Sequence, residues 1–92
     1  MPINHEVDTE LFSICEDILN KNLDLEAWVL AESSDEFQTK NYCGGFDATE
    51  GAFTFSYYDE NNHEFWFQLT HNAIKQVVDG EITEIEIIKA DL

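Results

Sequence analysis

Two runs of alternating aromatic residues, close together in the chain, constrain the fold more than any other feature of this sequence. They occupy residues 52–58 (AFTFSYY) and 63–69 (HEFWFQL), and Asp59-Glu60-Asn61-Asn62 separates them. Successive side chains of a strand point to opposite faces, so apolar residues at every second position indicate a sheet with one buried face. Turn-forming residues between two such runs predict a β-hairpin.

The register of this hairpin follows from the four phenylalanines that the two runs contain. Placing Tyr57 opposite His63 puts all four on one face and leaves a five-residue loop over residues 58–62. A slip of one residue would mix the two faces, which a half-buried sheet does not tolerate. The expected pairs are therefore Phe55 with Phe65 and Phe53 with Phe67.

Residues 8–21 have the spacing of an amphipathic helix. Their apolar members recur every three or four positions, as one helix face requires, and are Leu11, Ile14, Cys15, Ile18 and Leu19. Asp8 can cap the N-terminus, and Lys21 lies near the negative end of the helix dipole. The outward side is polar and includes Glu10, Glu16 and Asp17.

The middle of the chain predicts short elements. Residues 25–31 (LEAWVLA) fit either a strand or a short helix, and we favour a strand. Residues 37–42 are expected to form a weak polar strand, and Cys43-Gly44-Gly45 the turn that follows it.

The C-terminal third predicts a short helix followed by a strand. Thr70 can cap a helix over residues 71–78, which Asp79-Gly80 ends. Residues 82–88 alternate as expected for a strand with one wet side. Ile85 and Ile87 then share one face, and Glu84 and Glu86 share the other.

These elements specify an α+β protein in which the helices cover one face of an antiparallel sheet of about four strands, including the C-terminal one. The 92 residues suit a single compact domain over positions 1–92. The N-terminal residues before the first helix are expected to be loosely held. The other sheet face is then open and carries Thr54, Ser56, Tyr58, Glu64, Trp66, Gln68, Glu84 and Glu86.

Charge is the second constraint on this chain. It contains 20 Asp and Glu and four Lys, which gives a net charge of −16. Proteins that bind DNA or RNA neutralise phosphates with Lys and Arg, so this composition argues against direct nucleic-acid binding and against an anionic membrane surface. No apolar run reaches the roughly 20 residues of a spanning helix, and the N-terminus lacks the basic and apolar parts of a signal peptide. We therefore expect a cytoplasmic protein.

No motif in the sequence indicates catalysis, a cofactor or a metal. The acidic stretch from Asp59 lacks the glycine and the bidentate glutamate of a helix-loop-helix calcium site. His5, His63 and His71 lack the spacing of zinc ligands. A thiol nucleophile would require Cys43 with a histidine, but the surrounding acidic residues disfavour its thiolate. The sequence favours a protein without enzyme activity or cofactor.

Acidity and an open sheet face together favour recognition of a basic partner protein, above all one that handles nucleic acid. Carboxylates at alternate strand positions lie about 6.8 Å apart and can mimic a row of phosphates. Aromatic side chains can anchor the centre of an interface. The candidate partner-binding residues are Tyr58, Glu64, Trp66, Glu84 and Glu86 in the sheet, with Glu10, Glu16 and Asp17 on the helix.

In size and acidity the chain resembles several unrelated classes of small inhibitors, namely toxin immunity proteins, nucleic-acid mimics, anti-restriction proteins and anti-CRISPR proteins. That resemblance is one of composition and implies no correspondence between residues. The alternative function is a homodimeric structural or small-ligand-binding module. It would pack the open face against a second copy around Trp66 and Tyr58, and its acidity would serve solubility or salt adaptation.

Overall fold

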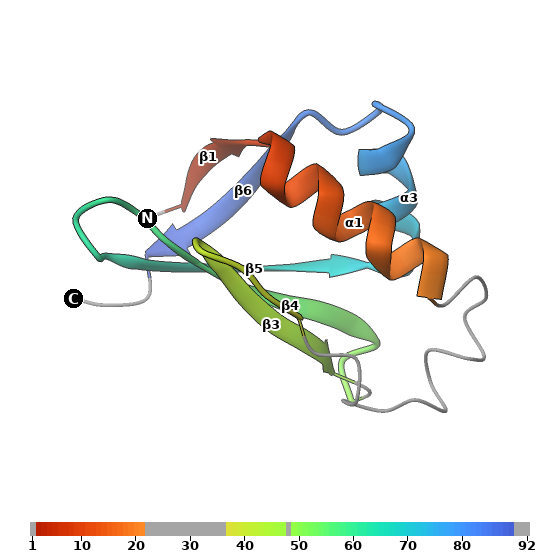
Figure 1. The fold of residues 1–92 in the computed structure, drawn as a ribbon, viewed down its shortest axis with the longest axis horizontal. Helices are drawn as coiled ribbons and strands as arrows, with labels where there is room; N and C mark the ends of the chain where they lie inside the picture. Colours follow the sequence, from red (N-terminus) through yellow and green to blue (C-terminus); the bar gives the residue numbers. More distant parts are fainter. Residues whose placement is uncertain (1, 22–36, 48, 90–92) are drawn as a thin grey trace.

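The computed structural model describes residues 2–21, 37–47 and 49–89 and has an α+β fold (Figure 1). Its elements in chain order are β1 (Pro2–Glu6), α1 (Thr9–Lys21), β2 (Phe37–Gln38), β3 (Tyr42–Asp47), β4 (Ala52–Tyr58), β5 (Glu64–Thr70), α3 (His71–Val78) and β6 (Glu84–Lys89). The strands form one antiparallel sheet in the order β1-β6-β5-β4-β3-β2. The predicted class is confirmed, and the described residues form six strands where the sequence indicated about four. Residues 25–31, for which we favoured a strand, lie outside the described part.

The two helices of the described residues, α1 and α3, contact each other and lie on the same face of the sheet, and the core is buried between the two layers (Figure 1). Burying one phenylalanine in such a core stabilises a fold by about 1.5–3 kcal/mol, so the aromatic alternation is a main determinant of this arrangement. The buried side chains include Leu11, Ile14, Cys15 and Ile18 of α1, Phe46, Phe53, Phe55, Phe67, Leu69, Ile85 and Ile87 of the strands, and Ile74 and Val77 of α3.

Each helix begins at the cap that the sequence predicts. The Oδ1 atom of Asp8 accepts a 2.8 Å hydrogen bond from the backbone N–H of Leu11, which satisfies one of the unpaired donors of the first turn. The hydroxyl of Thr70 accepts a 3.1 Å bond from the backbone N–H of Ala73. Because Thr70 is also the last residue of β5, the chain passes from strand to helix without a linker.

The hairpin of β4 and β5 confirms the face of the four phenylalanines and corrects their register. Tyr57 lies opposite Phe65, two residues along from the expected partner His63. The reason is a turn built on Asp59, whose Oδ1 atom accepts the backbone N–H groups of Asn61 and His63, both at 2.9 Å. The loop still has five residues, but it starts at Asp59. The observed pairs are Phe55 with Phe67 and Phe53 with Leu69.

The N-terminus is a strand, which corrects the expectation of a loose segment. β1 lies at one edge of the sheet and pairs antiparallel with β6, with Ile3 opposite Ile87 and His5 opposite Ile85. Five residues that include Pro2 and His5 are too few and too polar to give a strand signal of their own. This segment is ordered by hydrogen bonds to the backbone of β6, and the sequence of residues 2–6 alone does not indicate that pairing.

Cys43-Gly44-Gly45 lies within β3, and the expected turn there is wrong. Gly44 pairs with Phe55 on one side and with Phe37 on the other. A Cβ atom at Gly44 would overlap the carbonyl oxygen of Thr54 and come within 3.2 Å of the Phe37 ring, and the residue has a φ of 153°. The glycine therefore marks a close approach of neighbouring strands, a role that glycine serves in sheets as well as in turns.

Candidate functional site

We call the sheet face opposite α1 and α3 the outer face. Its members follow from strand register: Trp66 lies opposite Ser56 on one side and Ile88 on the other, while the alternate residues Phe65 and Phe67 pack toward the helices. All five sheet residues predicted to bind a partner lie on this face. Its members include Asn4, Glu6, Gln38, Cys43, Thr54, Ser56, Tyr58, Glu64, Trp66, Gln68, Glu84, Glu86 and Ile88.

The middle of the outer face is apolar and exposed. Trp66 of β5 and Ile88 of β6 are cross-strand partners and are 37% and 42% exposed. Tyr58 of β4, also on this face, is 37% exposed. Sequence reasoning missed Ile88, although continuing the alternation from Glu84 and Glu86 by one more step would have placed it here. Large apolar side chains grouped on an open sheet face are typical of contact surfaces.

Carboxylates flank this apolar centre. Glu6 of β1 lies directly opposite Glu84 of β6, and Asn4 lies opposite Glu86. All four side chains are exposed. Like charges directly opposite one another in a sheet destabilise it, so the Glu6 and Glu84 pair is unfavourable for the isolated chain. None of the outer-face residues named above is basic. Sequence reasoning missed Glu6 because it left the N-terminus out of the sheet.

One carboxylate of the outer face is fixed by an aromatic neighbour. The hydroxyl of Tyr58 donates a 3.0 Å hydrogen bond to Oε2 of Glu64, its cross-strand partner. This bond and the negative charge of Glu64 raise the pKa of Tyr58. The bond holds the Glu64 carboxylate beside the Tyr58 ring, two residues from Trp66 on the same strand.

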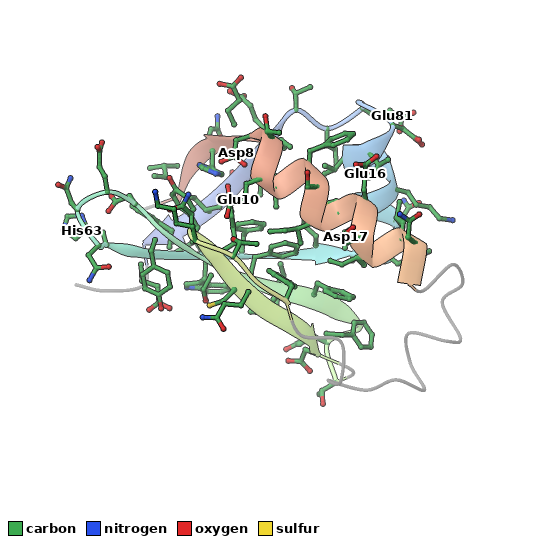
Figure 2. All side chains as sticks on the ribbon, in the orientation of Figure 1. Asp8, Glu10, Glu16, Asp17, His63 and Glu81 are labelled. Atoms are coloured by element: carbon green, nitrogen blue, oxygen red, sulfur yellow. The ribbon has the colours of Figure 1, made fainter. Side chains whose placement is uncertain are left out.

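The three predicted residues of α1 lie on the other side of the molecule from the outer face. Figure 2 shows Glu10, Glu16 and Asp17 along α1, in the helix layer. Glu16 and Asp17 are exposed, whereas Glu10 is half-buried and accepts bonds from the side-chain and backbone nitrogens of Asn41 at 2.9 and 3.3 Å. Hydrogen bonds from Thr39 and Asn41 lower the pKa of Glu10. Glu10 therefore ties α1 to the segment between β2 and β3.

A second polar cluster joins His5, Tyr42 and Asp8 beneath the start of α1. The Tyr42 hydroxyl donates to Oδ2 of Asp8 at 3.0 Å, and Nε2 of His5 lies 2.7 Å from the same hydroxyl. Tyr42 is 1% exposed, and its burial and the Asp8 charge raise its pKa. A buried tyrosine held in its neutral form suits a structural link between elements and not a nucleophile or base. Sequence reasoning missed this cluster because its members come from separate elements.

The histidines and cysteines are dispersed over the fold. His5 is in β1, His71 opens α3, and His63 lies at the β4–β5 loop, where Figure 2 labels it. Within residues 2–21, 37–47 and 49–89, no three His, Cys, Asp or Glu side chains group as metal ligands would. Burial raises the pKa of the Cys15 thiol to about 12, so its thiolate is strongly disfavoured. Cys43 is half-buried on the outer face, opposite Ser56.

Comparison of the chain with protein-family models, with curated proteins and with solved structures gave no match. In the described part of the chain, neither helix has the length and apolar character needed to cross a membrane. The functional proposal therefore depends on the outer face itself.

Proposed function

We propose that this chain is a non-enzymatic binding protein whose outer face recognises and masks a basic surface of a partner protein, in particular a surface that handles nucleic acid. One observation carries the proposal. The outer face combines the exposed apolar pair Trp66 and Ile88 with flanking carboxylates, and none of its described members is basic. An apolar centre with a charged rim is the usual anatomy of a specific interface.

The charges of the outer face favour a partner of opposite sign. Glu6 and Glu84 repel each other in the isolated chain, and a cation placed between them would relieve that repulsion. A net charge of −16 would also steer a basic protein toward the chain and raise the association rate at low salt. The partner's Lys and Arg residues would then meet carboxylates where they would otherwise meet phosphates.

The same charges argue against a second copy as the occupant of the outer face. A symmetric dimer through this face would pack together two surfaces that both carry Glu64, Glu84 and Glu86. Like-charge contacts across an interface cost several kcal/mol, and the apolar area around Trp66 and Ile88 would have to offset that cost. Light scattering over a wide concentration range tests this point. We expect a monomer, and a stable dimer would favour the homodimer alternative.

The proposal is tested with two matched double variants. Glu84→Gln/Glu86→Gln removes two exposed carboxylates from the outer face, and Glu16→Gln/Asp17→Asn removes two exposed carboxylates from α1. Both change the net charge equally. Each variant and the unmodified chain are used as bait in lysate of the source organism at low ionic strength, followed by stepwise salt elution and quantitative mass spectrometry.

We expect to capture a basic protein that elutes from the unmodified chain and from the α1 variant at the same salt concentration. The same protein should elute from the outer-face variant at a lower salt concentration. Equal elution from both variants would mean that only net charge is recognised and would overturn the proposal. Selective loss from the α1 variant would instead assign binding to Glu16 and Asp17, whose role in binding stays a prediction until then.

A further inference from the structure

We infer that the outer face selects arginine over lysine at its centre, with a guanidinium group of the partner stacked on the Trp66 indole and paired with the Glu64 carboxylate. This inference rests on the proposed function, because it specifies which basic side chain the same surface receives. It is carried by the surroundings of Trp66 and by the hydrogen bond that holds Glu64.

The position of Trp66 leaves its ring accessible. Its cross-strand partner on β4 is Ser56, a small residue, and on β6 it is Ile88, which is itself 42% exposed. Trp66 is 37% exposed although it lies in β5, an inner strand of the sheet. The exposed part of the Trp66 indole is open to a partner side chain, and Trp is the best aromatic platform for a cation.

An oriented carboxylate lies beside this ring. Glu64 precedes Trp66 by two residues on β5, which places both on the outer face about 6.8 Å apart at the backbone. The Tyr58 hydroxyl binds Oε2 of Glu64 at 3.0 Å. Within the described residues no other hydrogen bond to the Glu64 side chain is present, so Oε1 is available to a donor from a partner. Glu64 thus has Tyr58 opposite it on β4 and Trp66 two residues along β5, and its carboxylate is hydrogen-bonded to Tyr58.

This arrangement suits the chemistry of arginine better than that of lysine. A guanidinium group is planar and weakly hydrated, stacks on aromatic faces, and can donate N–H groups in its own plane to a carboxylate at the ring edge. A lysine ammonium is compact and strongly hydrated, so it gains less from an indole face that remains partly wet. Glu84 and Glu86, farther along β6, attract both side chains through charge alone.

The test is an NMR titration of the full-length chain with hexa-arginine and with hexa-lysine, two peptides of equal length and side-chain charge. The Trp66 indole N–H and the backbone amides of β5 and β6 report binding at the outer face. The Trp66→Phe and Trp66→Leu variants keep an apolar side chain at this exposed position, and Trp66→Phe also keeps a weaker aromatic platform. The Glu84→Gln/Glu86→Gln variant tests the charge contribution separately.

We expect hexa-arginine to bind the outer face about five- to ten-fold more tightly than hexa-lysine, as a cation–π contact of ordinary strength allows. Trp66→Leu should reduce this preference to less than two-fold by weakening hexa-arginine alone, and Trp66→Phe should give an intermediate value. Glu84→Gln/Glu86→Gln should weaken both peptides and keep the preference.

Three results would overturn the inference and separate it from the proposed function. If both peptides bind the outer face equally, arginine selection is wrong while the acidic binding surface stands. If Trp66→Leu weakens both peptides to the same extent, Trp66 is a general apolar contact and does not select arginine. If neither peptide shifts outer-face resonances, both the inference and the proposed function fail.

Discussion

The Tyr42 hydroxyl is bound to the Asp8 carboxylate, and this carboxylate also starts α1. Asp8 accepts a hydrogen bond from the Tyr42 hydroxyl on Oδ2 at 3.0 Å and one from the Leu11 backbone N–H on Oδ1 at 2.8 Å. A hydroxyl has one hydrogen to donate, and that of Tyr42 is donated to Asp8. In the 2.7 Å contact between His5 Nε2 and the Tyr42 oxygen, His5 is therefore the donor. One short chain of hydrogen bonds therefore joins β1, α1 and β3.

Removing the Tyr42 hydroxyl should destabilise the fold. In Tyr42→Phe, Asp8 Oδ2 and His5 Nε2 lose their shared partner in a partly buried position, which costs about 1–3 kcal/mol of unfolding free energy. Urea denaturation monitored by circular dichroism measures the change. Tyr57→Phe is the control, since it keeps the ring that contacts His5 at a centroid distance of 4.4 Å. Equal losses in the two variants would contradict the role of the Tyr42 hydroxyl.

His5 should make the fold less stable as the pH falls below neutrality. Burial lowers its pKa from 6.5, although the Asp8 and Glu6 charges oppose that shift. The folded state then binds a proton less readily than the unfolded state, so the stability contribution is complete above pH 6.5 and is lost as the pH falls from 6.5 toward the folded pKa. Relative to His5→Gln, the unmodified chain should lose unfolding free energy between pH 7.5 and pH 5. A relative gain over this range would show that His5 is favourably charged in the fold.

The contribution of Glu10 to the stability of the fold should depend on pH in the acid range. Hydrogen bonds from Thr39 and Asn41 lower its pKa from 4.5, so its contribution is present above that value and is lost as the pH falls through the folded pKa. Glu10→Gln should therefore be less stable than the unmodified chain at pH 7, and the difference should shrink below pH 4.5. Glu16→Gln, at an exposed position on the same helix, is the control for the removal of one negative charge from α1. Parallel pH curves for Glu10→Gln and the unmodified chain would contradict the role of Glu10.

A side chain at Gly44 should be poorly tolerated. Gly44→Ala would place a methyl group against the Thr54 carbonyl, and we expect a loss of about 2–4 kcal/mol or failure to fold. Gly80 provides the comparison because its φ is 83° and a methyl group there would meet no atom within 4 Å. Gly80→Ala therefore carries backbone strain alone and should cost about 1–2 kcal/mol. Thermal unfolding of both variants measures the difference, and an equal loss would mean that the close approach at Gly44 is readily relieved.

Neutralising Glu6 should stabilise the isolated chain. Glu6→Gln removes the repulsion with Glu84 and should raise the unfolding free energy by about 0.2–1 kcal/mol at low ionic strength. The gain should shrink as added salt screens exposed charges. Glu50→Gln, an exposed position outside the outer face, is the control for a general reduction of negative charge. If both substitutions stabilise equally, the specific pair contributes nothing. If the outer face binds a basic partner as proposed, Glu6→Gln should also weaken that binding, because it removes one carboxylate from the face.

The sequence predicted features that depend on local patterns. The helix caps at Asp8 and Thr70 and the shared face of the phenylalanines are confirmed because each depends on residues a few positions apart. The hairpin register was wrong by two residues because an alternating pattern fixes which face a residue takes, and a shift of two positions preserves every face. The turn hydrogen bonds of Asp59 favour the observed register.

The features that the sequence missed depend on pairing between distant segments. β1 is a strand because β6 lies beside it, and that neighbour also places Glu6 on the outer face. Gly44 lies in a strand because Thr54 and Phe37 approach it, whereas glycine pairs more often indicate turns. The predicted residues of the β4–β5 hairpin and of β6 share the outer face, but the prediction lacked Ile88 of β6 and the edge that β1 forms.

The position of β6 in the sheet has a consequence for the order of folding. The last strand in sequence lies between the first strand and the rest of the sheet, so β1 has no partner until residues 84–89 are available. During synthesis, α1 and the β3–β5 meander can form contacts early, while the edge that contains Glu6 is completed only when β6 emerges. Contacts between segments so distant in sequence slow folding. The acidic edge therefore requires β1 and β6 to have paired, and partner binding there would report that pairing.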